Sequence, residues 1–274
     1  MTTNTPLGKL YLVPAPLDFG CEPQAPLTEV MPAGTLLVAA RLGHWVCENA
    51  KTTRAYLKRV NELHPLATAV QAQQITELPR EVHKKGDHLG NFDAKPLLAA
   101  ALQGHDVGLV SEAGMPAIAD PGSSVVRAAH SLGMQVVPLV GPVSLLLALA
   151  ASGLNGQNFA FVGYLPTDGT QRAQRIRELE TLALKTGQTQ VFIETPYRNA
   201  ALLQALTQTL QTSTRLALCS GLTLASAHCR SDTVKAWRQA PLANSGSAMP
   251  AVFAIGLCLE LSGSSALSAS VSSY

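Results

Sequence analysis

The stretch LVSEAGMPAIADPG, from Leu109 to Gly122, carries the most information about the fold. It begins as an apolar strand and continues as a loop of small residues and prolines, whose only charged members are Glu112 and Asp120. Open parallel sheets bind their ligands beyond the carboxyl ends of the strands, where such a loop would lie. Small residues let the backbone approach a ligand closely, and prolines fix the shape of a loop. We therefore predict a ligand site at the end of this strand.

Two further stretches follow the same plan. KLYLVPAPLD (Lys9–Asp18) and VVPLVGPVS (Val136–Ser144) each read as a short buried strand that ends in prolines or glycine. One such loop would be explained by a tight turn between a strand and a helix. Three of them at one edge of a sheet favour a binding site.

The composition of the loops limits the ligand. The stretch 109–122 contains no Lys, Arg or His, and the chain contains neither the G-x-x-x-x-G-K-[ST] loop for triphosphates nor the G-x-G-x-x-G dinucleotide fingerprint. The expected ligand is therefore neutral or cationic, and partly apolar. S-adenosylmethionine (SAM), with its sulfonium and no phosphate, fits this description, whereas an NAD-type oxidoreductase is disfavoured.

The overall composition is that of a well-buried α/β protein. Of 274 residues, 47% are hydrophobic and 14% charged, which excludes a charged coil or a disordered chain. The net charge of +2 gives no global basic field, so an RNA-binding surface would have to be a local patch.

The cysteines and histidines predict no metal centre. The five cysteines are scattered singly without a C-x-x-C, and the seven histidines show no ligand spacing, so we expect reduced thiols in a cytoplasmic protein. We expect no signal peptide at the N-terminus. The most apolar stretch, 136–154, is interrupted by prolines and glycines, and predicts a strand, a turn and a helix rather than a membrane span.

Strands and helices alternate at short spacing, which predicts a parallel βαβ arrangement in the first half. We expect an N-terminal α/β domain over 1–139, a C-terminal α/β domain over 140–260 and a Ser-rich, disordered tail over 261–274. Within the first domain we predict one helix over 28–42, a long mobile loop over 79–92, and a helix capped by Asp120 with Pro121 at its first position.

Five blocks of sequence, in their order, resemble the tetrapyrrole methylase superfamily, and within it the ribosomal RNA small subunit methyltransferase I branch. The resemblance implies a two-domain tetrapyrrole-methylase-like fold with SAM in the inter-domain cleft, a homodimer, and methyl transfer to a ribose 2′-hydroxyl of small-subunit rRNA, a step of rRNA processing. The blocks are GKLYLVPAPLDFG, GLVSEAGMPAIADPG, VVPLVGPVSLLLALAASGL, FAFVGYLP and FIETPYRN.

The resemblance also implies the cofactor contacts, most of them backbone or apolar. Carried over by position, they fall on Pro14, Gly114, Met115, Ile118, Val143, Ser144, Ile193, Cys219 and Ala251.

The acceptor side departs from the branch. Where relatives carry Glu-Asp-Thr-Arg after the second strand, this chain has Glu48-Asn49-Ala50-Lys51, which loses one charge and the bidentate fork of arginine. We take Glu48, as base or orienting group, and Lys51 as the candidate catalytic residues. Glu48 could equally be a carboxylate at a helix start, where the macrodipole favours it.

Alternative functions remain open at this stage. One is methylation of a small molecule, such as a tetrapyrrole carbon, and another is a SAM-binding protein that has lost catalysis. For an rRNA partner, one basic stripe stands out: Lys51, Arg54, Lys58 and Arg59. Exposed helix charges are ordinarily a solvated face, so this stripe alone does not decide between the functions.

Overall fold

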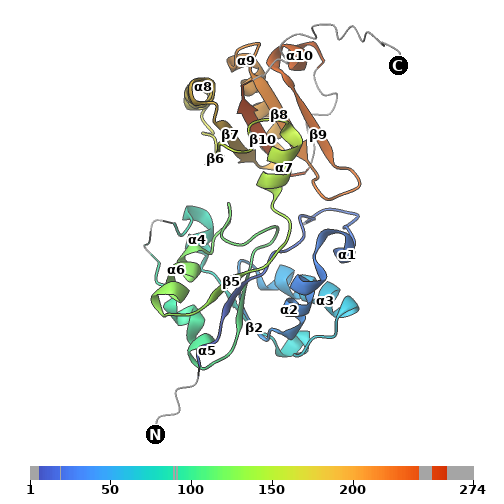
Figure 1. Ribbon diagram of the computed structural model, residues 1–274, viewed down its shortest axis with the longest axis vertical. Helices are drawn as coiled ribbons and strands as arrows, with labels where there is room; N and C mark the ends of the chain where they lie inside the picture. The colour runs from blue at the N-terminus through green and yellow to red at the C-terminus, as the bar shows by residue number, and fades with distance from the viewer. Residues whose placement is uncertain (1–5, 19, 89, 91, 241–248, 258–274) are drawn as a thin grey trace, which may run out of the picture. The chain divides into compact units, whose positions relative to one another are not determined.

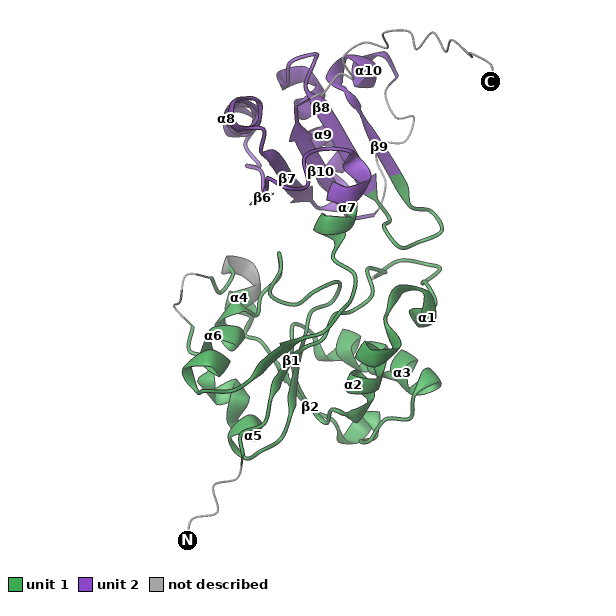
Figure 2. Cartoon of the chain, viewed as in Figure 1, with its two compact units in different colours: residues 1–148, 220–228 green, residues 149–219, 229–274 purple. Residues whose placement is uncertain are grey.

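The computed structural model describes residues 6–257, apart from 19, 89, 91 and 241–248. The chain divides into two compact units, coloured separately in Figure 2. Unit 1 comprises residues 1–148 and 220–228, and unit 2 comprises 149–219 and 229–274. The sequence suggested a boundary between 139 and 140, whereas the chain first changes unit after residue 148. The expected Ser-rich tail lies outside the described residues.

Unit 1 is built on a parallel sheet, of which β2 and β5 are labelled in Figure 1. Its five strands lie in the order β3-β2-β4-β1-β5. All of its strand pairs are parallel, which confirms the βαβ prediction. Parallel pairing directs the carboxyl ends of these strands to one edge of the sheet. The strands are β1 Leu10–Leu12, β2 His44–Cys47, β3 Gln74–Glu77, β4 Val107–Val110 and β5 Val136–Pro138.

Helices bury both faces of this sheet. Tyr11 and Trp45 point into a core formed with α2 and α3, whereas their neighbours Leu10 and Val46 belong to a second core, formed with α4, α5 and α6. The helical segments are α1 Leu27–Val30, α2 Ala33–Arg41, α3 Ala50–Leu63, α4 Arg80–Lys85, α5 Ala99–Leu102, α6 Ser123–Ser131 and α7 Ser144–Ser152, with the 3-10 turns η1 Val70–Ala72 and η2 Lys95–Leu98.

Two predictions for unit 1 were wrong. The helix expected over 28–42 is interrupted at Met31, whose extended backbone separates α1 from α2, because the Pro32 ring disfavours a helical conformation in the residue before it. The segment expected to be a loop over 79–92 contains α4, which buries Val82 against the second core.

The start of α6 also differs from the prediction. Gly122, not Asp120, is the N-cap residue, and it supplies no side-chain cap. The carboxylate of Asp87 provides the cap instead, accepting hydrogen bonds from the backbone N–H groups of Gly122 at 2.9 Å and Ser124 at 2.8 Å. Asp87, which is distant in sequence, therefore binds the free N–H groups at the start of the helix that Asp120 was expected to cap.

Unit 2 contains a mixed sheet in the order β6-β7-β10-β8-β9. Strand β7 pairs in parallel with β6 and antiparallel with β10, and α8, α9 and α10 bury their apolar sides in one core with the sheet. None of the helices in the described part of the chain has the length and apolar character that crossing a bilayer requires. The elements are β6 Phe159–Tyr164, α8 Gly169–Thr186, β7 Thr189–Glu194, η3 Pro196–Arg198, α9 Asn199–Thr209, β8 Arg215–Ser220, β9 His228–Thr233, α10 Val234–Gln239 and β10 Ala251–Gly256.

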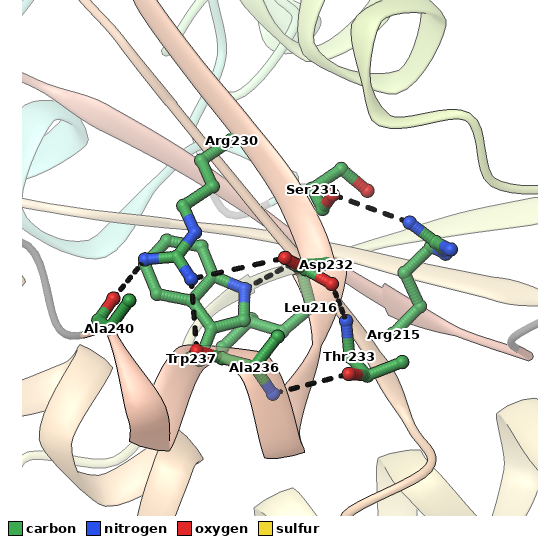
Figure 3. A network of polar contacts seen from close by, with 9 residues as sticks. All are labelled: Arg215, Leu216, Arg230, Ser231, Asp232, Thr233, Ala236, Trp237 and Ala240. Atoms are coloured by element: carbon green, nitrogen blue, oxygen red, sulfur yellow. Dashed lines mark hydrogen bonds and ion pairs between the residues drawn. The ribbon is translucent and has the colours of Figure 1, made fainter.

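The sequence did not predict β9 or α10. Figure 3 shows how Arg230 of β9 joins these two elements. Its guanidinium lies 4.0 Å from the centre of the Trp237 ring and donates to the carbonyl oxygens of Ala236 and Ala240. Trp237 is fully buried and donates from its indole nitrogen to the Leu216 carbonyl. One arginine thus caps the end of α10 and covers its buried aromatic residue.

Candidate functional site

Three loops meet at the carboxyl edge of the sheet in unit 1. Ala15, after β1, and Gly114, after β4, exchange two backbone hydrogen bonds of 2.9 and 3.0 Å. Gly141, after β5, packs against Pro14 so closely that an added Cβ would lie 2.3 Å from the proline Cγ. The three glycine- and proline-containing stretches therefore form one structure, as expected from their places after parallel strands.

Carboxylates from two of the loops at this edge lie together. Glu48 follows β2, and its carboxylate accepts a hydrogen bond of 2.8 Å from the backbone N–H of Glu112, which follows β4. Asp120 lies in the same neighbourhood: burial raises its pKa to about 7, and the charges of Glu48 and Glu112 add to the rise. We call these three residues the acidic cluster. At neutral pH, Asp120 exchanges a proton readily, while an ordinary aspartate is fully ionised.

Ser111 lies beside the acidic cluster. It is 5% exposed, and its hydroxyl makes no hydrogen bond of normal geometry within the described residues. It is nevertheless close enough to Asp120 for its hydroxyl to lower the pKa of that carboxyl, against the effect of burial. A buried hydroxyl without a partner costs free energy, so this group has an unused capacity for a ligand atom.

The loop after β4 has an unusual backbone. Ala117 and Ala119 have φ angles of 64° and 65°, in the left-handed region that residues with a Cβ rarely adopt. Each such residue costs about 1–3 kcal/mol and persists only where the surroundings enforce it. The surrounding contacts therefore fix the shape of the loop that carries Asp120.

The cofactor contacts expected in unit 1 all lie on these loops. Pro14 and Gly114 are buried, Met115 is half-buried and Ile118 is exposed by 47%. Val143 and Ser144 lie at the start of α7, where Val143 accepts backbone hydrogen bonds from Leu146 and Leu147. The structure thus brings six residues of the expected set to one sheet edge: Pro14, Gly114, Met115, Ile118, Val143 and Ser144.

The other three expected contacts lie on neighbouring strands of unit 2. Ile193 of β7 pairs with Val252, next to Ala251 at the start of β10. Cys219 is buried near the end of β8, the other neighbour of β10. Burial raises the pKa of the Cys219 thiol well above its usual range, and Cys229 on β9 adds to the rise, so the thiol remains protonated at neutral pH.

The altered stretch Glu48-Asn49-Ala50-Lys51 has a clear local structure. Asn49 is the N-cap of α3, and its side chain accepts from the backbone N–H groups of Lys51 at 2.9 Å and Thr52 at 3.3 Å. Asn and Asp serve nearly equally as N-caps, so this departure preserves the helix start. Lys51 is exposed, and the Glu48 carboxylate binds the loop after β4.

The basic stripe on α3 is shorter than the sequence suggested. Lys51, Arg54 and Lys58 are exposed. Arg59 instead turns to the buried Asp18, to which it donates two hydrogen bonds of 2.9 and 3.1 Å. Three cations of this helix are thus available to a polyanion.

Asp120, which the sequence predicted as a helix cap, lies instead in the acidic cluster. In unit 2, Glu194 pairs with Arg198 at 2.7 Å. Among the described residues, no group of three His, Cys, Asp or Glu side chains is arranged to hold a metal ion. The buried hydroxyl of Ser111 and the carboxylates of the acidic cluster suit a ligand with hydrogen-bond donor groups.

Known proteins are similar to this chain in sequence. A family model described as Tetrapyrrole (Corrin/Porphyrin) Methylases matches residues 39–236. A ribosomal RNA small subunit methyltransferase I of Mesorhizobium japonicum is 39% identical over 145 residues, which are 53% of this chain and 48% of that protein. The protein of the same name from Escherichia coli O157:H7 is 28% identical over 79% of this chain and 66% of its own length. The matches thus span about half to two thirds of these relatives.

A solved structure is similar in fold. It is a uroporphyrin-III-C-methyltransferase from Thermus thermophilus, with a TM-score of 0.50 and 19% sequence identity. The likeness covers 91% of this chain and 94% of that structure. The chain therefore has the fold of a known methylase.

Proposed function

Because the chain belongs to the tetrapyrrole methylase family, we propose that it is a SAM-dependent methyltransferase. The observation that carries this proposal is the convergence of three uncharged or acidic loops at the carboxyl edge of the parallel sheet, around Glu48, Glu112 and Asp120. No phosphate-binding cation comes from the stretch 109–122, in keeping with a cofactor that has no phosphate.

We propose as cofactor contacts the residues inferred from the family resemblance. In unit 1 these are the loop positions Pro14, Gly114, Met115, Ile118, Val143 and Ser144. In unit 2 they are Ile193, Cys219 and Ala251. When bound, SAM supplies a methyl group that is already activated by its sulfonium. The chain then has to align the acceptor and to accept the proton that the acceptor loses.

The proposed acceptor is a ribose 2′-hydroxyl of small-subunit rRNA. Curated relatives bear the name ribosomal RNA small subunit methyltransferase I. The exposed Lys51, Arg54 and Lys58 on α3 support an RNA partner, because phosphate contacts supply most of the affinity for nucleic acid. Lys51 lies in the first turn of α3, close in sequence to Glu48.

Two further features are part of the proposal. A homodimer is supported by the exposed apolar side chains of Leu146 and Leu147 on α7 and of Val140, which is 73% exposed. A cytoplasmic location follows from the proposed rRNA substrate.

The decisive experiment uses methyl-labelled SAM, the purified chain and small ribosomal subunits from cells that lack the gene. We expect label in the RNA and, after digestion, in a 2′-O-methyl nucleoside. Loss of labelling in Lys51→Ala and Arg54→Ala with unchanged SAM binding would support the basic face. The matched control is Arg175→Ala, an exposed arginine on α8.

Other outcomes would favour the remaining functions. SAM binding in calorimetry without labelled RNA would contradict the rRNA acceptor and favour a SAM-binding protein without catalysis. Absorbance of a porphyrinoid in the purified protein, with transfer of label to it, would favour a small-molecule acceptor.

A further inference from the structure

We propose that the carboxylate of Asp120 accepts the proton of the acceptor hydroxyl during methyl transfer. This inference rests on the proposed methyltransferase function and adds a catalytic residue to it. The candidates drawn from the sequence were Glu48 and Lys51; the structure points to Asp120 instead.

Glu48 holds two of the segments at this edge of the sheet together. Its carboxylate accepts the backbone N–H of Glu112 at 2.8 Å and thereby joins the segments after β2 and β4. Lys51 is exposed and carries its charge on a flexible stem. Glu48 is therefore a positioning residue for the loop that carries Asp120.

The carboxylate of Asp120 is placed differently. Burial and the charges of Glu48, after β2, and Glu112, after β4, raise its pKa to about 7, while the nearby hydroxyl of Ser111 partly offsets the rise. An efficient general base has a pKa near the working pH, because it must be both ionised and basic. The side chain is only partly buried, so a substrate can reach it.

Ser111 supports a ligand at this place. Its hydroxyl is buried and close enough to Asp120 to lower the pKa of that carboxyl, but it makes no hydrogen bond of normal geometry among the described residues. A substrate hydroxyl placed between the two could donate its proton to Asp120 and accept the hydrogen bond of Ser111. The left-handed backbone of Ala117 and Ala119 gives the loop a fixed shape before the substrate binds.

The step balances without a further reactant. A lone pair of the acceptor oxygen forms the new O–C bond, the C–S bond breaks, and its electron pair stays on the sulfur. The O–H proton passes to the Asp120 carboxylate and from there to solvent. Because protonated Asp120 cannot act in this way, the rate should fall as the pH decreases below about 7.

The test compares wild type, Asp120→Asn and Glu112→Gln in single-turnover methylation of the small subunits across a range of pH. Asp120→Asn should lower the rate by about 10²–10⁴-fold without weakening the binding of S-adenosylhomocysteine in calorimetry. Glu112→Gln removes one negative neighbour and should move the midpoint of the pH profile to lower pH. Carbon-13 NMR titration of the aspartate carboxyl groups should contain one signal with a pKa near 7 that Asp120→Asn removes.

The matched control is Asp106→Asn, at the amino end of β4, where Asp106 pairs with Arg41. A rate and pH profile of Asp120→Asn equal to those of wild type would overturn this inference and leave the proposed function intact. A loss of S-adenosylhomocysteine affinity in Asp120→Asn with an unchanged rate would also overturn it, in favour of a binding role. Failure of the wild-type chain to methylate RNA would overturn the proposed function and the inference together. If Asp120→Asn does not fold, the profile of Glu112→Gln decides: an unshifted midpoint contradicts the inference.

Discussion

Asp87 binds Ser124 twice, although 37 positions separate them: its carboxylate accepts the backbone N–H at 2.8 Å and the hydroxyl at 2.6 Å. Burial raises the pKa of Asp87, but these bonds and those from Ser123 and Gly122 outweigh it and hold the pKa below its usual value. The first turn of α6, directly after the loop of Asp120, is thus anchored by a residue from the segment after α4.

Asp87→Ala should lower the free energy of unfolding by about 2–3 kcal/mol, because several buried hydrogen bonds and a helix cap are lost together. Urea unfolding at neutral pH measures this. Asp168→Ala is the control: Asp168 caps α8 through a single exposed hydrogen bond to Gln171 and should cost about 1 kcal/mol. Equal effects of the two changes would contradict the anchoring role of Asp87. Since the pKa is lowered on folding, the contribution of Asp87 should be present above about pH 4 and be lost as the pH falls further.

The pH dependence of stability should reveal Asp120 without any assay of activity. Its pKa is raised from 3.8 to about 7 on folding, so its contribution to stability is complete below about pH 4 and is lost as the pH rises past 7. Asp120→Asn, which cannot ionise, should therefore be more stable than wild type at about pH 8, by roughly 2–4 kcal/mol, and equally stable near pH 4. Urea unfolding at the two pH values checks this. A constant difference would show that Asp120 titrates normally.

Gly141→Ala should disturb the meeting of the loops, because the new Cβ would lie 2.3 Å from the Cγ of Pro14. We expect a loss of about 1–3 kcal/mol in stability and weaker binding of S-adenosylhomocysteine in calorimetry. Gly34→Ala is the control within the same unit. Gly34 lies in α2 with open space around its Cα, so alanine there should raise stability by about 0.5–1 kcal/mol. Wild-type affinity in Gly141→Ala would argue against a cofactor at these loops.

Arg230→Lys should destabilise unit 2 although the charge is kept. Lysine cannot donate to both the Ala236 and Ala240 carbonyls while it covers the Trp237 ring, so we expect a loss of about 1–2 kcal/mol. Tryptophan fluorescence during urea unfolding follows the change. Arg175→Lys on α8, where the arginine pairs with the exposed Glu178, should have almost no effect. Similar midpoints for the two variants would mean that the contacts in Figure 3 contribute little.

The sequence predicted the parts of the fold whose signals are local. Buried strands such as Val107–Val110 are continuous apolar runs, and their alternation with helices predicted the parallel sheet. Strand β9, HCRSDT, has no apolar alternation, because it is a half-exposed edge strand held by backbone pairing and by Arg230. The same distinction between local signals and long-range contacts applies to the candidate site. Its loops were found from glycines and prolines, whereas the pKa of Asp120 depends on Glu48, 72 positions earlier in the chain, which spacing along the sequence cannot reveal.

The division into units has a practical consequence for protein engineering. The chain passes from one unit to the other three times, after residues 148, 219 and 228. A fragment that stops at Ala148 would contain the complete parallel sheet and the acidic cluster but would lack 220–228, which belong to the same unit. Truncation at a single point therefore cannot yield an intact unit 1. A minimal version of unit 1 would need that nine-residue insert grafted back, for example by circular permutation or by expressing it as a separate peptide.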